Sequence, residues 1–255
     1  MNRNLTSFTC IARKETTRIF RIWIQTLVPP VITMILYFII FGRLIGSQLR
    51  DIGGYDYMAF IAPGLIMMSI ITNSYTNTVS SFFSAKFQRN IEELLVSPTP
   101  DWIIVLGYVS GGMVRGLVVG FLVSITSFLF TRIPLFNLGY VVMFAVLTSF
   151  VFSLAGMING IFARKFDDIS IIPTFVITPL TYLGGVFYSI SLLPDFWQAL
   201  SRANPIIYMV DGFRYGFLGV SDINVLTGLG MLVLFSIILF SINLFLLKNG
   251  VGVRT

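Results

Sequence analysis

The side chains of this sequence that could perform acid-base chemistry are carboxylates, and they form two adjacent pairs, Glu92-Glu93 and Asp167-Asp168. Neighbouring carboxylates can act as general acid and base. The G-x-G-D pattern of intramembrane aspartyl proteases does not surround Asp167 and Asp168, so we expect no catalysis from them. We predict instead that both residues cap the helix that follows, where negative charge favours the positive end of the helix dipole.

Other catalytic chemistry is limited by what the sequence lacks. The 255 residues contain no histidine and one cysteine, Cys10, which excludes Ser-His and Cys-His nucleophile pairs and an intramolecular disulfide. Metal sites built from imidazole and thiolate are excluded for the same reason. No G-x-x-x-x-G-K-[ST] loop is present to bind ATP. We therefore expect no catalytic residue, no metal and no cofactor on this chain, and interpret Cys10 as a reduced thiol without a role.

Composition indicates the environment in which the chain folds. It is 56% hydrophobic and only 11% charged, against about 25% charged residues in soluble domains. A membrane-spanning helix needs about 20 apolar residues. We predict an all-α membrane protein of six transmembrane helices, over residues 24–45, 59–83, 102–131, 138–162, 169–189 and 223–247. All eleven acidic residues lie outside these segments, so no carboxylate is available for proton-coupled transport.

The basic residues predict the orientation in the membrane. With the N-terminus inside the cell, eleven of the seventeen lysines and arginines, Arg254 among them, fall on cytoplasmic segments. The opposite side holds Arg43, Arg50, Arg132, Arg202 and Arg214. The positive-inside rule then places both termini in the cytoplasm. Because the basic excess follows topology, we expect no nucleic-acid partner.

A polar segment from Lys86 to Asp101 separates the second and third spans and falls on the cytoplasmic side. As a helix it is amphipathic, and the prolines at 98 and 100 end it. Its apolar stripe is Phe87, Ile91, Leu94 and Leu95, and its polar side holds Lys86, Arg89, Asn90, Glu92 and Glu93. Such a helix is too short to cross a bilayer, so we expect it to contact another protein. A second cytoplasmic turn is formed by Arg164, Lys165, Asp167 and Asp168.

The N-terminal segment, residues 1–23, is predicted to be an interfacial helix. One stripe carries Phe8, Ile11, Ala12, Ile19, Ile22 and Trp23, and an adjoining face carries Lys14, Arg18 and Arg21. Such a helix places its apolar side in the headgroup boundary and its basic side against anionic lipid or a partner. Glu15 interrupts the stripe, and a purely topological role for the positive charge is the alternative.

Residues 191–222 are too apolar for a solvated loop and too interrupted by proline and glycine for two further spans. We predict two short helices, residues 195–203 and 206–218, hinged at Asn204-Pro205 as a re-entrant or interfacial hairpin on the outer face. Candidate conduit or gate residues are Trp197, Tyr208, Phe213 and Arg214 here, with Arg115 in the third span. An aromatic belt is the alternative for the rings, and snorkelling or packing is the alternative for Arg115.

Glycines are concentrated in the third span, at Gly107, Gly111, Gly112, Gly116 and Gly120. Small residues four positions apart let another helix approach closely. We therefore predict tight helix packing along this span.

Together, four segments resemble the permease subunits of ABC-2 type ATP-binding-cassette exporters, a family of drug, nodulation-factor and polysaccharide permeases. They are residues 87–95 with the following prolines, 166–168, 179–185, and 204–205 leading to 212–214. The resemblance implies one ABC-2 type domain over residues 1–255, with an amphipathic helix (1–23), a six-span core (24–247) and a cytoplasmic tail (248–255). Residues 89–95 match the family's coupling helix, and residues 192–218 match its helical hairpin.

The resemblance further implies a partner that supplies the energy. In this family two copies of a separate ATP-binding subunit bind ATP and Mg and drive export across the bacterial inner membrane. The permease pairs with a second copy of itself or with a related chain. Drug, lipid and polysaccharide all remain open as substrate. An ATP-independent secondary transporter or channel, and a membrane scaffold that transports nothing, are the alternative functions.

Overall fold

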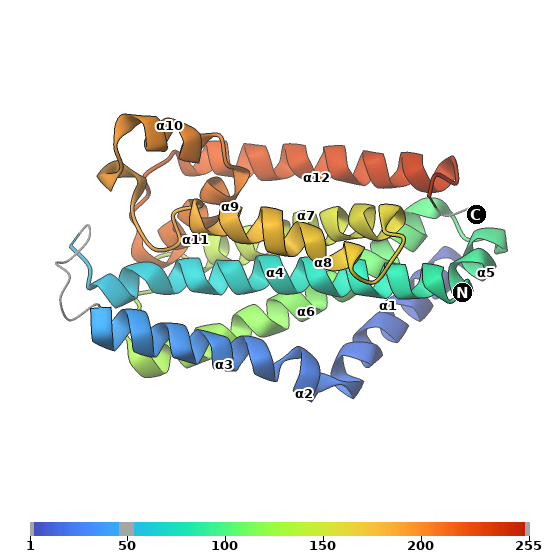
Figure 1. The fold of residues 1–255 in the computed structure, drawn as a ribbon, viewed down its shortest axis with the longest axis horizontal. Helices are drawn as coiled ribbons and strands as arrows, with labels where there is room; N and C mark the ends of the chain where they lie inside the picture. Colours follow the sequence, from blue (N-terminus) through green and yellow to red (C-terminus); the bar gives the residue numbers. More distant parts are fainter. Residues whose placement is uncertain (1–2, 46–53, 253–255) are drawn as a thin grey trace.

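The computed structural model describes residues 3–45 and 54–252, and every regular element in these two ranges is a helix. The helices run side by side in one elongated bundle, with the chain ends at one end of it (Figure 1). Arg50 and Arg254, which entered the orientation argument, lie outside the described residues, as do the side chain of Arg43 and residues 1–2 and 253–255 of the predicted terminal segments.

One long helix forms the centre of the bundle. Helix α4 (Tyr57–Phe87) packs against α6 (Asp101–Phe130) and α7 (Leu138–Phe162), while α12 (Val225–Lys248) lies outside α7. Of the most apolar stretch of α4, 89% is buried, against 17% for α12. Several buried polar side chains of α4 donate to carbonyls of the preceding turn, as Ser69 does to Leu65 at 3.0 Å and Thr78 to Ser74 at 3.2 Å. Helix α12 leaves one apolar face uncovered, including Val233, Ile237 and Phe245, as a lipid-facing helix does.

Five helical stretches of the described residues are long and apolar enough to cross a membrane. They are Trp23–Phe41, α4, α6, α7 and α12. The first is subdivided into α2 (Trp23–Thr26), α3 (Val28–Tyr37) and a π-helical segment η1 (Phe38–Ile45). The prolines at 29 and 30 fall in the first turn of α3, where their missing amide hydrogens are not needed.

The predicted fifth span, residues 169–189, is interrupted, so the structure does not confirm a sixth continuous span. It is divided into α8 (Asp168–Ile172), a π-helical segment η3 (Pro173–Ile177) and α9 (Thr178–Tyr182). Pro173 and Pro179 each lack an amide hydrogen, which disturbs the regular α-helical bonding. Gly185 then adopts a left-handed conformation (φ 71°), and the chain leaves the helix before residue 189.

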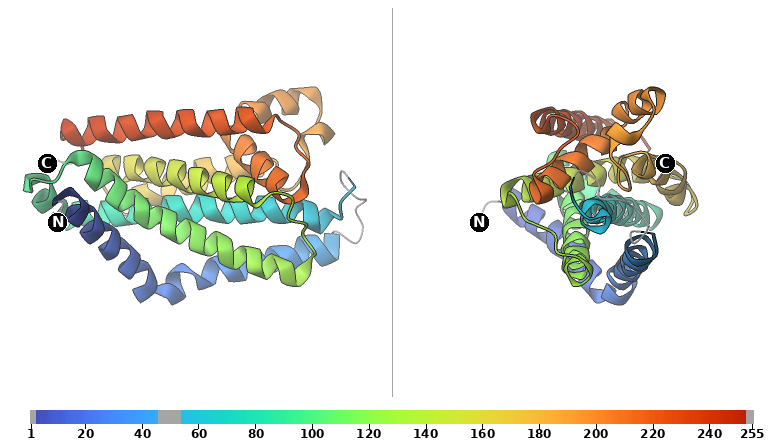
Figure 2. Two further views of the ribbon diagram at one scale, coloured as in Figure 1. Left: turned by 180° about the vertical axis from the view of Figure 1, so that it is seen from behind. Right: turned by 90° about the vertical axis from the view of Figure 1, so that its left-hand side faces the viewer.

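The two short helices predicted before the last span are present. They are α10 (Asp195–Arg202) and α11 (Pro205–Leu218), preceded by a single 3-10 turn η4 (Ile190–Leu192). The Asn204 side-chain oxygen accepts a hydrogen bond from the Ile206 amide at 3.0 Å, and Pro205 occupies the first helical position. This is a favourable helix start. Helix α10 lies at the end of the bundle away from the chain ends (Figures 1 and 2).

The N-terminal helix α1 (Arg3–Arg21) slants outward from the bundle, and after the bend at α2 helix α3 slants back toward it (Figure 2). Glycines of α6 explain how the neighbouring helices come so close. A Cβ atom added to Gly107 or Gly111 would lie 2.5 Å or 2.6 Å from a side-chain atom of α1. The next three glycines of α6 face α4 in the same way, Gly116 with its Cβ position 3.0 Å from the Ile70 oxygen. The predicted glycine packing is therefore confirmed.

Candidate functional site

The polar segment between α4 and α6 forms a separate short helix at the end of the bundle that holds the chain ends. Helix α5 covers Asn90–Val96 and is preceded by Arg89 in the left-handed conformation (φ 62°). That conformation is uncommon for a residue other than glycine and breaks the backbone direction between α4 and α5. Phe87 therefore belongs to the last turn of α4, and the prediction that it shares one helical stripe with Ile91 is wrong.

Helix α5 packs on the bundle mainly through one buried apolar residue. Ile91 is 1% exposed and packs in a cluster with residues of α1, α4 and α6, while Leu94 and Leu95 are half-buried at its edge. The opposite face is exposed and carries Asn90, Glu92 and Glu93. Both carboxylates lie in the first turn, where they favour the positive end of the helix dipole. The predicted amphipathic character of residues 90–95 is therefore confirmed.

An aromatic contact brings together the two predicted cytoplasmic segments. The Phe166 ring, in the turn between α7 and α8, lies 5.0 Å from the Phe83 ring and 5.1 Å from the Phe87 ring, both edge-on. Edge-to-face pairs at this distance add about 0.5–1.5 kcal/mol beyond their buried area. Phe87 and Phe166 are 61% and 52% exposed, so this aromatic cluster also reaches the surface.

Lys86 makes a second connection between these segments. Its ammonium Nζ donates to the Ile161 carbonyl at 2.6 Å and to the Ala163 carbonyl at 2.9 Å. The last carbonyls of a helix have no partner within it, and a lysine satisfies them and favours the negative end of the dipole. The sequence placed Lys86 on the polar side of the amphipathic segment, because nothing local indicates a partner 75 residues away.

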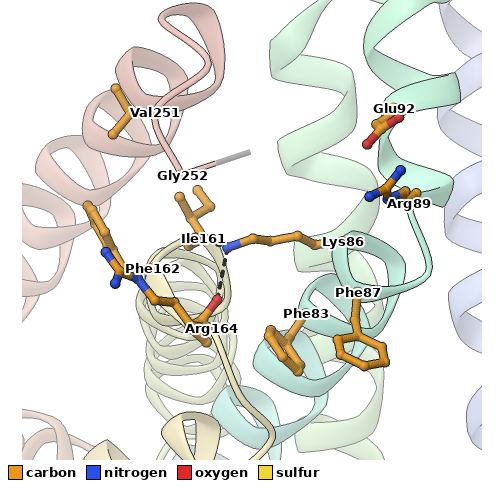
Figure 3. A pocket seen from close by; sticks show the side chains of 11 residues that line it. Phe83, Lys86, Phe87, Arg89, Glu92, Ile161, Phe162, Arg164, Val251 and Gly252 are labelled. Carbon is orange, nitrogen blue, oxygen red and sulfur yellow. Dashed lines mark hydrogen bonds between the residues drawn. The ribbon is translucent and has the colours of Figure 1, made fainter. Parts of the chain in front are cut away.

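A groove of about 700 Å³ opens between α5 and the end of α7. Glu92 and Arg89 lie on its α5 side, Phe162 and Arg164 lie on its α7 side, and Lys86 crosses between them (Figure 3). A second groove of about 430 Å³ separates α5 from α1 and is lined by Glu93, Asn90 and Lys14 among others. Helix α5 is thus a ridge with a recess on each side. Its exposed polar groups suit a protein contact better than a reaction.

The turn from Arg164 to Asp168 is ordered by one carboxylate. Asp168 Oδ2 accepts hydrogen bonds from the backbone amides of Arg164 at 2.8 Å and Lys165 at 2.9 Å. These two bonds hold the pKa of the Asp168 carboxyl below its ordinary value. The predicted capping of the following helix is wrong in detail, since neither Asp167 nor Asp168 makes a side-chain cap there. Asp168 instead bonds backward to the turn.

The predicted conduit or gate residues are not brought together. Arg115 donates to the Thr26 carbonyl at 3.4 Å, beside the bend between α1 and α3. Trp197 is 46% exposed on α10, and the Tyr208 hydroxyl donates to the Arg202 carbonyl. Helices α2 and α10 lie on opposite sides of the bundle (Figure 1). Arg115 and Trp197 therefore cannot line one constriction within a single chain.

Phe213 and Arg214 have a structural role in α11. Both are almost fully buried, and Arg214 donates to the Gly185 carbonyl at 2.5 Å and the Phe60 carbonyl at 3.3 Å. Its guanidinium also lies 4.0 Å above the Phe60 ring. Arg214 thus attaches α11 to α4 and to the turn after α9.

The comparisons with known proteins agree with this architecture. The family model described as "ABC-2 type transporter" matches residues 6–218. The chain belongs to that family, and it is a multi-pass inner membrane protein of the transport permease class. Membership of an ABC transporter family implies a system with an ATP-binding partner.

Individual relatives support the same classification. The chain is 60% identical over 242 residues to "Inner membrane transport permease YadH" of Escherichia coli strain K12, covering 95% of this chain and 94% of that protein. It is 26% identical over 216 residues to "Nodulation protein J" of Rhizobium leguminosarum bv. trifolii, covering 84% and 82%. The resemblance to ABC-2 type permeases drawn from the sequence is therefore confirmed.

Proposed function

We propose that this chain is the membrane-spanning subunit of an ATP-driven exporter and that α5 is its contact with a separate ATP-binding subunit. The observation that carries the proposal is the exposed polar face of α5, with a recess on each side, at the end of a membrane bundle. Asn90, Glu92 and Glu93 point outward there although the chain has few charged residues. Exposed charged and polar groups give a docking surface its specificity.

A force on α5 can reach the rest of the bundle through two sets of contacts. Ile91 packs into the buried cluster formed by residues of α1, α4 and α6. The contacts of Phe166 and Lys86 connect the end of α4 to the segment between α7 and α8. Closure of the ATPase on its nucleotide would therefore tilt α4 and shift α8 together. The interrupted helices η1 and η3 would absorb that movement, because π-helical segments have irregular hydrogen bonding.

The rest of the assembly follows from the same proposal. Both termini and α5 lie on the cytoplasmic side, the broken segment α8–α9 completes a sixth crossing, and two copies of the permease form the conduit. The ATP and Mg belong to two copies of the partner, and the permease hydrolyses nothing. Lipid surrounds the apolar faces of α12 and the first span.

The experiment reconstitutes the permease with its ATPase and measures substrate-stimulated ATP hydrolysis. Replacement of both α5 carboxylates, Glu92→Ala with Glu93→Ala, is expected to reduce stimulation severalfold and to weaken copurification of the two subunits. Asp195→Ala is the matched control, because Asp195 is also an exposed carboxylate in the first turn of a short helix, at the other end of the bundle. Unchanged coupling in the double variant would remove these residues from the contact.

The same preparation separates the alternative functions. Transport by the permease alone, with no ATPase present, would indicate a secondary transporter or channel. Stable binding of an ATPase without any substrate-dependent hydrolysis would indicate a scaffold.

A further inference from the structure

Helix α1 presents three different faces. Ile11, Glu15 and Ile19 are buried against the bundle. The second face is apolar and open: Phe20 at the end of α1 is 50% exposed, and Trp23 and Ile24 directly after it are 53% and 62% exposed. Phe20 belongs to α1, whereas Trp23 and Ile24 follow the backbone break at Ile22 (φ −114°) and begin the first membrane-spanning stretch. The third face is the one that carries the basic residues.

That third face is a groove of about 490 Å³ with cationic walls. It is lined by Cys10, Arg13, Lys14, Thr17, Arg18 and Arg21, without a carboxylate. Glu15, the one acidic residue of the helix, points away from the groove into the bundle and forms an ion pair with Arg18 at 3.2 Å. That is the one ion pair among the side chains that the structure describes, so the charges of Arg13, Lys14 and Arg21 are not neutralised by any of them.

We propose that this groove binds the phosphate of an anionic phospholipid headgroup, with Arg13, Thr17 and Arg21 as its contacts. These three residues lie four positions apart on one exposed stripe and offer two guanidinium groups and a hydroxyl. Guanidinium groups bind phosphate oxygens through paired hydrogen bonds. The open apolar residues Phe20, Trp23 and Ile24 place the acyl chains of the same lipid beside the groove.

Charge complementarity alone would also allow an acidic protein surface to bind this groove. The position of the groove decides against it, because Trp23 and Ile24 begin the first membrane-spanning stretch two residues after Arg21, and Phe20 is exposed beside the groove, so the end of α1 lies at the level of the lipid headgroups. The slant of α1, from the end of the bundle that carries α5 toward the membrane-spanning α3, runs across the expected headgroup region (Figure 2). The proposal needs only the membrane location of the chain and does not depend on ATPase coupling.

The test uses the fluorescence of Trp23 in the full-length permease. The other two tryptophans, Trp102 and Trp197, are replaced by phenylalanine. The protein is reconstituted in phosphatidylcholine vesicles, with a minor fraction of brominated phosphatidylglycerol or of brominated phosphatidylcholine as quencher. Brominated phosphatidylglycerol is expected to quench Trp23 at a lower mole fraction, and high salt should reduce the difference.

Replacement of Arg13 and Arg21 by glutamine should abolish this preference. Each arginine near an anionic surface is expected to contribute about a fivefold preference for the anionic lipid. The preference should therefore be roughly 25-fold lower in the double variant than in the parent protein. Lys248→Gln, outside α1, is the matched control and should retain it. Equal quenching by the two lipids would overturn the proposal. So would a double variant that keeps its lipid preference but no longer copurifies with the ATPase, since the groove would then be a protein contact.

Discussion

Glu15 of α1 accepts a hydrogen bond of 2.6 Å from the Ser81 hydroxyl of α4, and the carboxylate is 1% exposed. The same oxygen pairs with Arg18, which reaches on to the Asn77 side chain at 3.0 Å. A buried carboxylate is tolerated only when it is paired and hydrogen-bonded. The N-terminal helix is therefore attached to the central helix of the bundle by a polar joint and does not rest on the membrane surface alone.

Removing this carboxylate should loosen α1. Glu15→Ala removes the acceptor of the Ser81 hydroxyl and the counter-ion of Arg18, which keeps only its hydrogen bonds to Asn77. A lost hydrogen bond to a charged group costs roughly 1.5–3 kcal/mol. Arg18 is a third exposed and can turn to water, so the lower half of that range is expected. Thermal unfolding of the purified permease in detergent measures the change. Glu92→Ala is the control, at an exposed carboxylate without a side-chain partner among the described residues, and should leave the midpoint unchanged. An equal fall of the midpoint in the two variants would contradict the attachment of α1 to α4 through Glu15.

The same residue shows how far the sequence could predict the structure. The stripe of Ile11 and Ile19 indicated an amphipathic helix, and α1 is one. What this stripe contacts was predicted only in part. The sequence assigned it to the headgroup boundary, whereas Ile11 and Ile19 pack on the bundle. Glu15 looked like a flaw in an apolar stripe because its partner, Ser81, is 66 residues away. Periodicity reports which residues share a face but not what that face contacts.

Other features likewise divide into those that the local sequence predicts and those that only the fold determines. The hinge at Asn204-Pro205 was predictable because its chemistry is local: an asparagine caps a helix and a proline begins it. The left-handed Arg89 was not, because no glycine or asparagine marks the position. The contact of Phe87 with Phe166 joins segments that sequence reasoning had identified separately, and only the fold brings them together. The interruption at η3 follows from Pro173 and Pro179, which the sequence displayed, although apolar length alone had indicated a full span.

Two glycines should respond in opposite directions to the same substitution. A Cβ added to Gly156 in α7 would lie 2.5 Å from the Tyr75 carbonyl oxygen in α4, and backbone cannot move aside cheaply. Gly156→Ala is therefore expected to destabilise the bundle by about 1–3 kcal/mol, as overpacking does. Gly230 in α12 has open space around it, so Gly230→Ala should be neutral or slightly stabilising. Unfolding midpoints of the two variants in one detergent give the comparison, and equal midpoints would show that α4 and α7 are not in close contact.

Loss of the Lys86 ammonium should release the turn after α7. Lys86→Met keeps an unbranched side chain but removes both hydrogen bonds to the Ile161 and Ala163 carbonyls. These carbonyls then have no partner, and amide exchange in residues 163–168 should increase severalfold. Lys165→Met is the matched control, since the Lys165 side chain makes none of the described hydrogen bonds. If exchange rises equally in the two variants, charge near the turn matters and the Lys86 bonds do not.

The turn itself should depend on pH through Asp168. The backbone amides of Arg164 and Lys165 hold its pKa below the ordinary value, so the ionised form stabilises the turn. That stabilisation is complete above the ordinary pKa of an aspartate, about 4, and is lost as the pH falls through the lowered value in the folded protein. Hydrogen exchange of these two amides, corrected for intrinsic rates, should therefore lose protection on acidification. In Asp168→Asn the protection should already be low at neutral pH and should no longer vary with acid. If the wild-type protection proved independent of pH while the Asn variant matched it, the carboxylate would not order the turn.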